Sequence, residues 1–287
     1  MAAAVVDADG HWTLVSAIAD GSAIVPQAHA VNDAGTVVGG TLPGLSSFVE
    51  CAFMWTVDEG SHCIDRPPQD LGSTASDINN DGTIVGHKST FAADGISITD
   101  RAWILAPGDQ AVALLPLGPD DTWSRANAIN DRGDIVGASG TGQPTDLNGR
   151  AVLWRAPDYQ PVELEVAGAV ASVAFGINAR GMIVGGRWAA DGTVQTVVWN
   201  RRLEPRLLTA GFAADIADDG APVGFVLRDN RQLAARFDPH TFQAEVLDPG
   251  GRESRAVAAA GTHIVGLFRP PDSNVTHVAR FTSSESG

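Results

Sequence analysis

The sequence predicts an all-β protein, a single six-bladed β-propeller with four-stranded blades, and three observations carry this prediction. One motif recurs six times, and a fixed period of this length is typical of a repeat architecture. Each copy is followed by a short apolar run that ends in an aromatic residue. Gly and Pro are abundant, at 32 and 16 of 287 residues, and no window shows the long 3.6-residue apolar period of a helix.

The repeated motif reads Ala-x-x-Ile-Asn-Asp-x-Gly-x-Ile-Val-Gly. Four copies keep it closely, the fifth is degraded, and the sixth retains mainly its end. The copies occupy residues 28–39, 75–86, 126–137, 174–185, 213–224 and 255–266. Their closing glycines are separated by 39 to 51 residues, which is the length of one four-stranded blade.

Each repeat predicts four strands in order. The Ala-x-x-Ile stretch predicts the first strand and the Ile-Val-Gly stretch the second. Asn-Asp-x-Gly predicts the hairpin turn between them, because Asn, Asp and Gly tolerate positive φ. The third strand is expected to end in an aromatic residue, as in Phe53-Met54-Trp55, and the fourth in Leu-Gly, as in residues 68–72 and 114–118.

We expect one domain over residues 1–287. The expected blades cover residues 28–72, 75–118, 126–166, 174–209, 213–248, and 255–282 together with 11–18. The last copy supplies three strands and stops at Phe281, so the early strand 11–18 is expected to complete that blade and close the propeller. Such closure hides two sheet edges that would otherwise be open to aggregation.

The charge balance excludes several classes of partner. Asp and Glu total 34 against 19 Lys and Arg, a net charge of −15, which argues against nucleic acid and against an anionic membrane surface. No stretch of 18 apolar residues exists, and the first residues lack the basic region of a secretory signal. We therefore expect a monomeric cytoplasmic protein, or a secreted one if a leader has been removed.

The two cysteines, Cys51 and Cys63, are too few for a disulfide framework. They could bridge a hairpin in an oxidising compartment. The missing signal favours the other alternative, two unpaired thiols.

A family resemblance rests on Phe53-Met54-Trp55, Asp70-Leu71-Gly72 and the stretch SDINNDGTIVG at residues 76–86. Together these resemble the HAF repeat of bacterial proteins. The resemblance covers residues 28–281 and implies a repeat fold and an extracellular location, without a uniform activity. The name-giving triplet stands here as Cys51-Ala52-Phe53 and Arg101-Ala102-Trp103.

The site is expected at the mouth of the central channel, where residues of the first strand differ between copies. His29 or His87 could act as a general base near pH 7, with Asp77 or Asp215 orienting it. Arg125 or Arg255 could hold a carboxylate or stabilise an enolate. Expected ligand contacts are Gln27, Asn127, Trp123, Phe175, Arg187, Trp188, Phe212 and Arg255. For each residue the alternative is a solvated or salt-bridged channel side chain, and the tryptophans either form a ligand platform or plug the mouth.

The sequence gives no sign of a cofactor. The His residues are scattered, no HxH, HExxH or CxxC spacing occurs, and Walker, GxGxxG and GxSxG motifs are missing. Three functions stay open: a cofactor-independent lyase, cyclase or isomerase, a carbohydrate-binding propeller, and a protein-interaction platform. Because the mouth residues differ between copies, we expect one asymmetric site for a small organic molecule or sugar, and we favour the enzyme.

Overall fold

The computed structural model describes residues 4–6, 12–14, 25–42, 51–65, 71–92, 94–144, 148–208, 211–247, 250–260 and 263–281. All regular elements in these ranges are β-strands, and paired strands run antiparallel. The fold is the six-bladed β-propeller that the sequence predicts. The chain divides into two compact units, unit 1 (Met1–Val162) and unit 2 (Glu163–Gly287).

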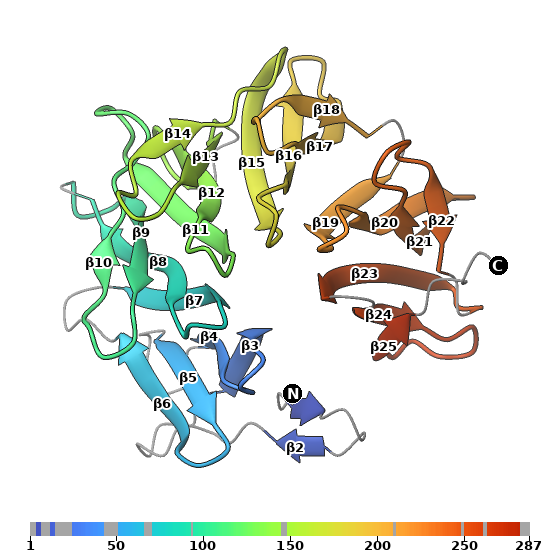
Figure 1. Ribbon diagram of the computed structural model, residues 1–287, viewed down its shortest axis with the longest axis horizontal. Coiled ribbons are helices and arrows are strands. Elements are labelled where there is room, and N and C mark those ends of the chain that lie inside the picture. The colour runs from blue at the N-terminus through green and yellow to red at the C-terminus, as the bar shows by residue number, and fades with distance from the viewer. Residues whose placement is uncertain are drawn as a thin grey trace. The chain divides into compact units, whose positions relative to one another are not determined.

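The described part of unit 1 contains a two-stranded sheet and three four-stranded blades (Figure 1). The two-stranded sheet pairs β1 (Ala4–Val6) with β2 (Trp12–Leu14). Blade one consists of β3 (Val25–Val31), β4 (Val37–Leu42), β5 (Ala52–Thr56) and β6 (Gly60–Asp65). Blade two consists of β7 (Gly72–Ile78), β8 (Ile84–Phe91), β9 (Ile98–Leu105) and β10 (Val112–Ala113). Blade three consists of β11 (Trp123–Ile129), β12 (Ile135–Gly140), β13 (Arg150–Trp154) and β14 (Pro161–Glu163).

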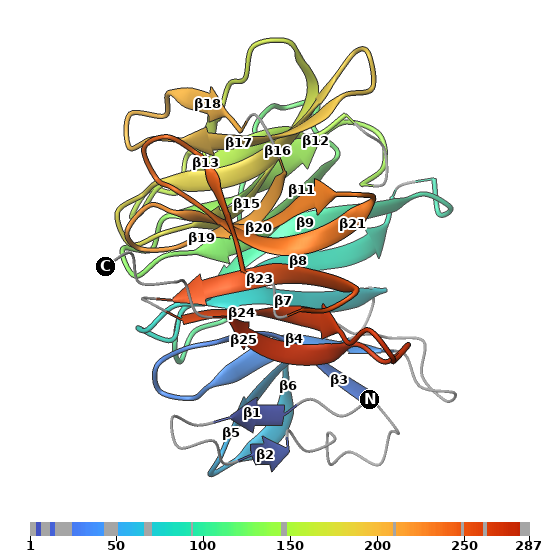
Figure 2. The same cartoon turned by 90° about the vertical axis from the view of Figure 1, so that its right-hand side faces the viewer.

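The described part of unit 2 contains two four-stranded blades and a three-stranded one. Blade four consists of β15 (Ala169–Ile177), β16 (Ile183–Ala189), β17 (Val194–Trp199) and β18 (Pro205–Leu207). Blade five consists of β19 (Phe212–Ile216), β20 (Pro222–Arg228), β21 (Arg231–Phe237) and β22 (Ala244–Val246). Blade six consists of β23 (Glu253–Ala260), β24 (His263–Arg269) and β25 (His277–Phe281), which run side by side in Figure 2.

The described part of the N-terminal strand forms a hairpin. Residues 12–14 form β2, which pairs with β1, and a short connecting loop keeps the entropic cost of this hairpin low. Residues 11 and 15–18 of the expected closing strand lie outside the described residues. The expected pairing of this strand with the last blade would join the two units and stays a prediction.

The fourth strand of blade one also begins earlier than expected. Gly60, at φ +70°, permits a tight turn directly after β5, so β6 forms from residues 60–65. Gly72 was expected to end that strand but instead begins β7 of blade two. Residues 66–70 lie outside the described part of the chain.

The motif asparagine explains why the turns repeat so closely. Oδ1 of Asn79 accepts the N–H of Thr83 at 2.9 Å and so closes its own turn, while Nδ2 donates to the carbonyl of Asn130 in blade three at 3.2 Å. Asn32 makes the same bond toward blade two, to the carbonyl of Asn79 at 3.2 Å. In unit 2, Asn178 bonds the carbonyl of Ala217 in blade five at 2.9 Å. Both a donor and an acceptor are required, which an amide supplies and a carboxylate does not.

The two motif glycines have separate steric causes. Gly82 adopts φ +81° in the turn, a conformation that L side chains rarely take. A Cβ at Gly86 would lie 2.0 Å from the carbonyl oxygen of Thr74 on the neighbouring strand, where the register shifts between Ala75 and Asp77. The closing glycine of the motif therefore allows the bulged first strand to approach the second.

The apolar core lies between successive blades of each unit. In unit 1, Trp103 of blade two packs with Val38 and Ala52 of blade one, and Trp154 of blade three packs with Val85 and Ala102 of blade two. Both tryptophans are fully buried. In unit 2, Phe237 of blade five packs with Val184 and Val198 of blade four. The aromatic residues of the third strands therefore fill the spaces between blades.

Cys51 and Cys63 form a disulfide, which corrects the preference for free thiols. The register of blade one pairs Ala52 with Asp65 and Phe53 with Cys63, so the two cysteines lie beside one another at the β5–β6 hairpin, with their Cα atoms 5.8 Å apart. The preference for thiols rested on the start of the chain, which carries no information about this hairpin.

We expect the disulfide to stabilise blade one. The bridge closes a loop of sequence separation 12, so a Cys51→Ser, Cys63→Ser double variant should lose about 2–3 kcal/mol of unfolding free energy. Urea denaturation with and without a reductant measures this loss. The reductant should lower the midpoint of the natural protein and leave that of the double variant unchanged. Equal midpoints for the natural protein in both conditions would contradict a stabilising bridge.

Replacing the motif asparagine should cost far more than replacing its exposed neighbour. Asn79→Ala removes the bonds to Thr83 and Asn130, and the loss of both bonds, with the N–H of Thr83 left without its acceptor, should cost about 2–3 kcal/mol. Asp81→Ala, at an exposed position of the same turn, is the control and should change stability by less than about 0.5 kcal/mol. Thermal unfolding of both variants decides whether the inter-blade bond matters.

Candidate functional site

Four residues of unit 1 form what we term the polar cluster: His29, His87, Asp100 and Arg125. They come from β3, β8, β9 and β11, and so from three successive blades. Asp100, Arg125 and His29 all lie close enough for their charges to act on the pKa of His87. The structure thus brings together three of the five residues expected to do acid–base chemistry, and adds Asp100.

Asp100 is the buried anchor of the polar cluster. Its side chain is 1% exposed, and Oδ1 accepts the hydroxyl of Ser89 at 2.6 Å. Oδ2 accepts from both Nε and Nη2 of Arg125. A buried carboxylate needs such a partner because an unpaired charge in the interior is costly. The pair fixes the Arg125 guanidinium, which remains 38% exposed and keeps donors for a ligand.

His87 is neutral near pH 7. Its pKa is lowered to about 4, mainly by burial; the charge of Asp100 opposes this shift, and the charges of Arg125 and His29 contribute to it. Its Nδ1 is buried and has no hydrogen-bond partner within the described ranges. A buried ring nitrogen without a partner is uncommon in folded proteins and often marks a site for a ligand or a water molecule.

His29 is exposed, and a backbone carbonyl orients its ring. Nδ1 lies 2.8 Å from the carbonyl oxygen of Ala75 in blade two. Because a carbonyl can only accept, Nδ1 carries the proton in this bond, and in the neutral ring Nε2 is then the proton acceptor. This is the tautomer that a general base requires, presented at an exposed position.

Asp77 and Asp215 hold the blades together. Oδ1 of Asp77 accepts the N–H of Ile78, and Oδ2 accepts the N–H of Ile129 in blade three, both at 2.8 Å. Asp215 occupies the same motif position and bonds Ile216 at 2.8 Å and Ala259 of blade six at 2.9 Å. Each carboxylate therefore connects its bulged strand to the next blade, and Ala75 orients His29 in place of the expected Asp77.

Burial raises the pKa of Asp215 to about 6, although the N–H donors of Ala259 and Ile216 favour the charged form. The preceding blade accommodates this carboxyl group through a glycine, since a Cβ at Gly176 would lie 2.7 Å from its Oδ1. These contacts give Asp215 a structural role between blades, and its expected part in orienting a histidine stays a prediction.

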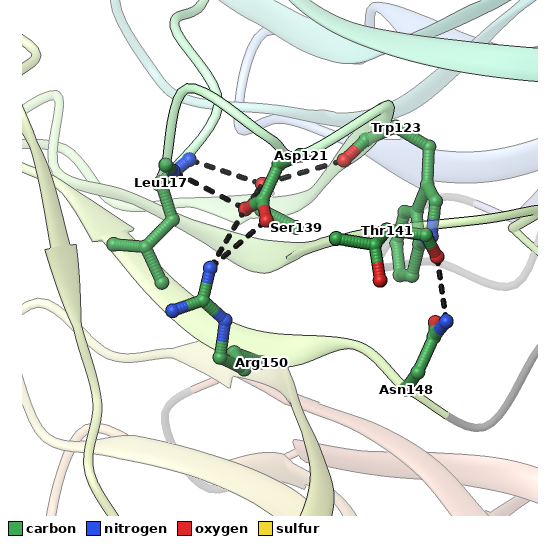
Figure 3. Close-up of polar contacts among 8 residues, drawn as sticks. Leu117, Asp121, Trp123, Ser139, Thr141, Asn148 and Arg150 are labelled. Atoms are coloured by element: carbon green, nitrogen blue, oxygen red, sulfur yellow. Dashed lines mark hydrogen bonds and ion pairs between the residues drawn. The ribbon is translucent and has the colours of Figure 1, made fainter.

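Trp123 packs inside blade three and does not offer an open ring face. The residue is 5% exposed, and its indole N–H donates to the carbonyl of Thr141 at 3.2 Å (Figure 3). Beside it, buried Asp121 accepts the hydroxyl of Ser139 at 2.6 Å and Nη2 of Arg150 at 2.9 Å (Figure 3). Of the two alternatives for this tryptophan, packing is the one that its burial supports.

The remaining expected ligand residues are distributed over both units. Gln27 is exposed on β3 and Asn127 is half-buried on β11. Arg187 and Trp188 are half-buried on β16, where Arg187 donates to Oε1 of Gln195 at 2.6 Å and 3.1 Å. The rings of Phe175 and Phe212 lie 5.4 Å apart, and Phe225 stacks on Phe212 at 5.6 Å. Arg255 is exposed on β23 and borders a hollow in unit 2.

The blades carry different chemistry at equivalent positions of the repeat. His29 and Phe175 both follow the motif alanine, Arg125 and Phe212 both precede it, and His87 and Phe225 both follow the closing glycine. Blades one to three carry His29, His87 and Arg125 at these positions, and blades four and five carry Phe175, Phe212 and Phe225, while the other copies have residues such as Gly40, Ala138 and Val173 there. Side chains there are therefore not dictated by the repeat, in contrast to those of the turns.

Asp100 was not identified from the sequence. It precedes the Arg101-Ala102-Trp103 triplet, inside a stretch that resembles a loop. Strand alternation gives the relevant signal, because Asp100, buried Ala102 and Ile104 share one face of β9. A buried acid two residues before a core alanine implies a nearby cation, which is Arg125.

The described residues contain no group of three or more His, Cys, Asp or Glu side chains placed to hold a metal ion. Nor does any described segment form a helix with the length and apolarity needed to cross a membrane.

Comparisons with known proteins establish the fold and no more. No family model matches the chain, and no curated protein matches it either. A puromycin-hydrolyzing peptidase of Mycobacterium tuberculosis is 13% identical, with a TM-score of 0.61 over 96% of this chain and 47% of that one. The Pyrococcus horikoshii acylaminoacyl peptidase is 10% identical, with a TM-score of 0.62 over 98% and 46%. TolB from Acinetobacter baumannii is 11% identical, with a TM-score of 0.51 over 88% and 64%.

The chain spans about half the length of the two peptidases. Identities of 13% or less show a common fold only, so the activities of these proteins do not carry over. The resemblance to the HAF repeat stays a prediction.

The buried histidine should make stability depend on pH in a defined window. The folded pKa of His87, about 4, lies below its ordinary value of 6.5. Below pH 6.5 the unfolded chain therefore binds a proton that the folded chain excludes, and stability falls until about pH 4. His87→Gln should lose this part of the dependence. Urea midpoints measured from about pH 7 to about pH 4.5 provide the test, and parallel pH slopes for the two proteins would contradict it.

Proposed function

We propose that the polar cluster binds a small organic acid and that His29 acts there as a general base, without a cofactor. The supporting observation is the pairing of an exposed, carbonyl-oriented histidine with a fixed and partly exposed arginine. A lyase, cyclase or isomerase needs such a pair, because one group must take a proton and another must stabilise the negative charge that develops.

Arg125 is suited to hold the ligand. Its Nε and Nη2 are used by Asp100, so the guanidinium plane is fixed before a ligand arrives. The remaining N–H groups can donate to a carboxylate of the ligand. Fixing the arginine in advance lowers the entropic cost of binding.

His29 is suited to take the proton. With Nδ1 donating to Ala75, Nε2 can accept a proton from the carbon next to the bound carboxylate. The C–H bond breaks, its electron pair moves into the carboxylate as an enolate, and the proton resides on Nε2. Arg125 stabilises the added negative charge, and the proton returns to the same or another atom of the ligand. No oxidant or reductant is required.

His87 supports this chemistry by staying neutral. A charged imidazolium beside Arg125 would place a second buried positive charge in the polar cluster, and the low pKa of His87 removes that charge near pH 7. Its unpartnered Nδ1 is a further polar contact for a ligand.

Binding of carbohydrate, the first alternative, loses one of its two tryptophan platforms because Trp123 is buried in blade three. Trp188 is half-buried, so part of its ring can still contact a sugar, and carbohydrate binding through this residue can be tested. A lectin should also repeat its binding residues, whereas the positions of His29 and His87 carry other residues in the other blades and the arginine of Arg125 recurs in blade six alone, as Arg255.

Deuterium exchange tests the proposal without knowledge of the product. We expect the protein in D₂O to catalyse incorporation of deuterium at the carbon next to a carboxylate in at least one of a panel of small carboxylic acids, as detected by NMR. His29→Gln should abolish the exchange, and Arg125→Gln should reduce it mainly by raising the KM. His240→Gln, an exposed histidine in a turn of blade five, is the matched control and should retain it.

Exchange that persists in His29→Gln would show that this histidine is not the base. Absence of exchange with every acid, together with saturable binding of sugars that Trp188→Ala removes, would replace the enzyme proposal with carbohydrate binding.

A further inference from the structure

A second concentration of charge lies in unit 2, between blades five and six. Two adjoining hollows of about 240 Å³ and about 550 Å³ share Glu253 and Arg269 in their walls. Arg255 lines the first hollow, while Arg231 and Arg252 line the second. We term this region the arginine pocket.

The arginine pocket is cationic in a strongly acidic protein. Four of its lining residues are arginines and one is a glutamate, whereas the whole chain has a net charge of −15. Four arginines placed close together repel one another unless an anion lies between them. Concave walls also concentrate their field on a bound anion.

The backbone around the pocket is held in place. Nε of Arg231 donates to the carbonyl of Arg252 at 2.9 Å, and Nη2 donates to the carbonyl of Gly251 at 2.5 Å. The N–H of Arg252 bonds the carbonyl of Arg269 at 2.8 Å. Arg231 therefore shapes the wall, and the guanidinium groups of Arg252, Arg255 and Arg269 are left to meet a ligand, with Arg255 and Arg269 both lining the smaller hollow.

Glu253 marks where an oxyanion fits. Its Oε2 lies 3.1 Å from Nη1 of Arg269, and both side chains are well exposed, at 50% and 38%. Nε of Arg269 has no hydrogen-bond partner among the described residues. An exposed pair of this kind contributes little to stability, so an incoming anion can displace Glu253 from Arg269 at small cost.

From these contacts we infer that the arginine pocket is a binding site for a small organic dianion, carrying a phosphate or two carboxylates, which Arg255 and Arg269 hold. The hollow of about 240 Å³ is close to the lower end of small-molecule pockets, about 300 Å³, which suits a molecule of the size of a sugar phosphate or citrate. This site is separate from the polar cluster and does not rest on the function proposed for it.

Calorimetric titration of the full-length protein with inorganic phosphate and with citrate, in a buffer free of other oxyanions, tests this inference. We expect saturable binding of at least one probe, and the comparison distinguishes phosphate from carboxylate recognition. Arg255→Gln and Arg269→Gln should each weaken binding about tenfold or more, as expected for loss of a charge-assisted contact. Arg202→Gln, in an exposed turn of blade four, should leave it unchanged.

Glu253→Gln provides the decisive variant because it keeps the shape of the side chain and removes the competing charge. We expect it to tighten binding several-fold. Heat of binding that is lost in Arg125→Gln but kept in Arg255→Gln and Arg269→Gln belongs to the polar cluster, which separates the two sites. The inference is overturned if neither probe binds, if the two arginine variants bind like the natural protein, or if Glu253→Gln binds no more tightly.

Discussion

The hydrogen bond from one blade to the backbone of the next is the contact on which the rest of the structure depends. The motif asparagine makes it from the turn, as Asn79 does to Asn130, and a motif aspartate makes it from the bulge, as Asp77 does to Ile129. Each such side chain also bonds its own segment, so the local shape of a strand and its position against its neighbour are fixed together. Buried backbone groups between blades are satisfied in this way, which a purely apolar interface could not achieve.

This division of labour leaves other positions free to vary. The turns and the residues between blades are constrained, whereas the residues beside the motif alanine and after the closing glycine are not. Blades one to three carry His29, His87 and Arg125 at those positions, and blades four and five carry three phenylalanines, of which Phe212 packs against the other two. The turns and core positions thus repeat from blade to blade, whereas the residues beside the motif alanine and after the closing glycine differ. Function is therefore expected at these differing positions.

The repeat made the fold predictable, because its period, its turn residues and its aromatic positions all describe one blade. It also indicated where the polar cluster would be found. The repeat did not show which aspartates connect blades and which one binds an arginine. Asp77 and Asp100 are the same residue type and differ only in their strand and their partner, which the sequence does not display. The disulfide and the pairing of the first strand depend on which segments meet in space, which spacing along the chain does not specify.

The protonation states of the histidines are the most direct test of the polar cluster. Nitrogen-15 NMR distinguishes the neutral tautomers from the charged ring for each of the seven histidines. At about pH 6, we expect His87 to be neutral and His29, whenever it is neutral, to carry its proton on Nδ1. A charged His87 at that pH, or a neutral His29 with its proton on Nε2, would contradict the arrangement on which the proposed chemistry rests.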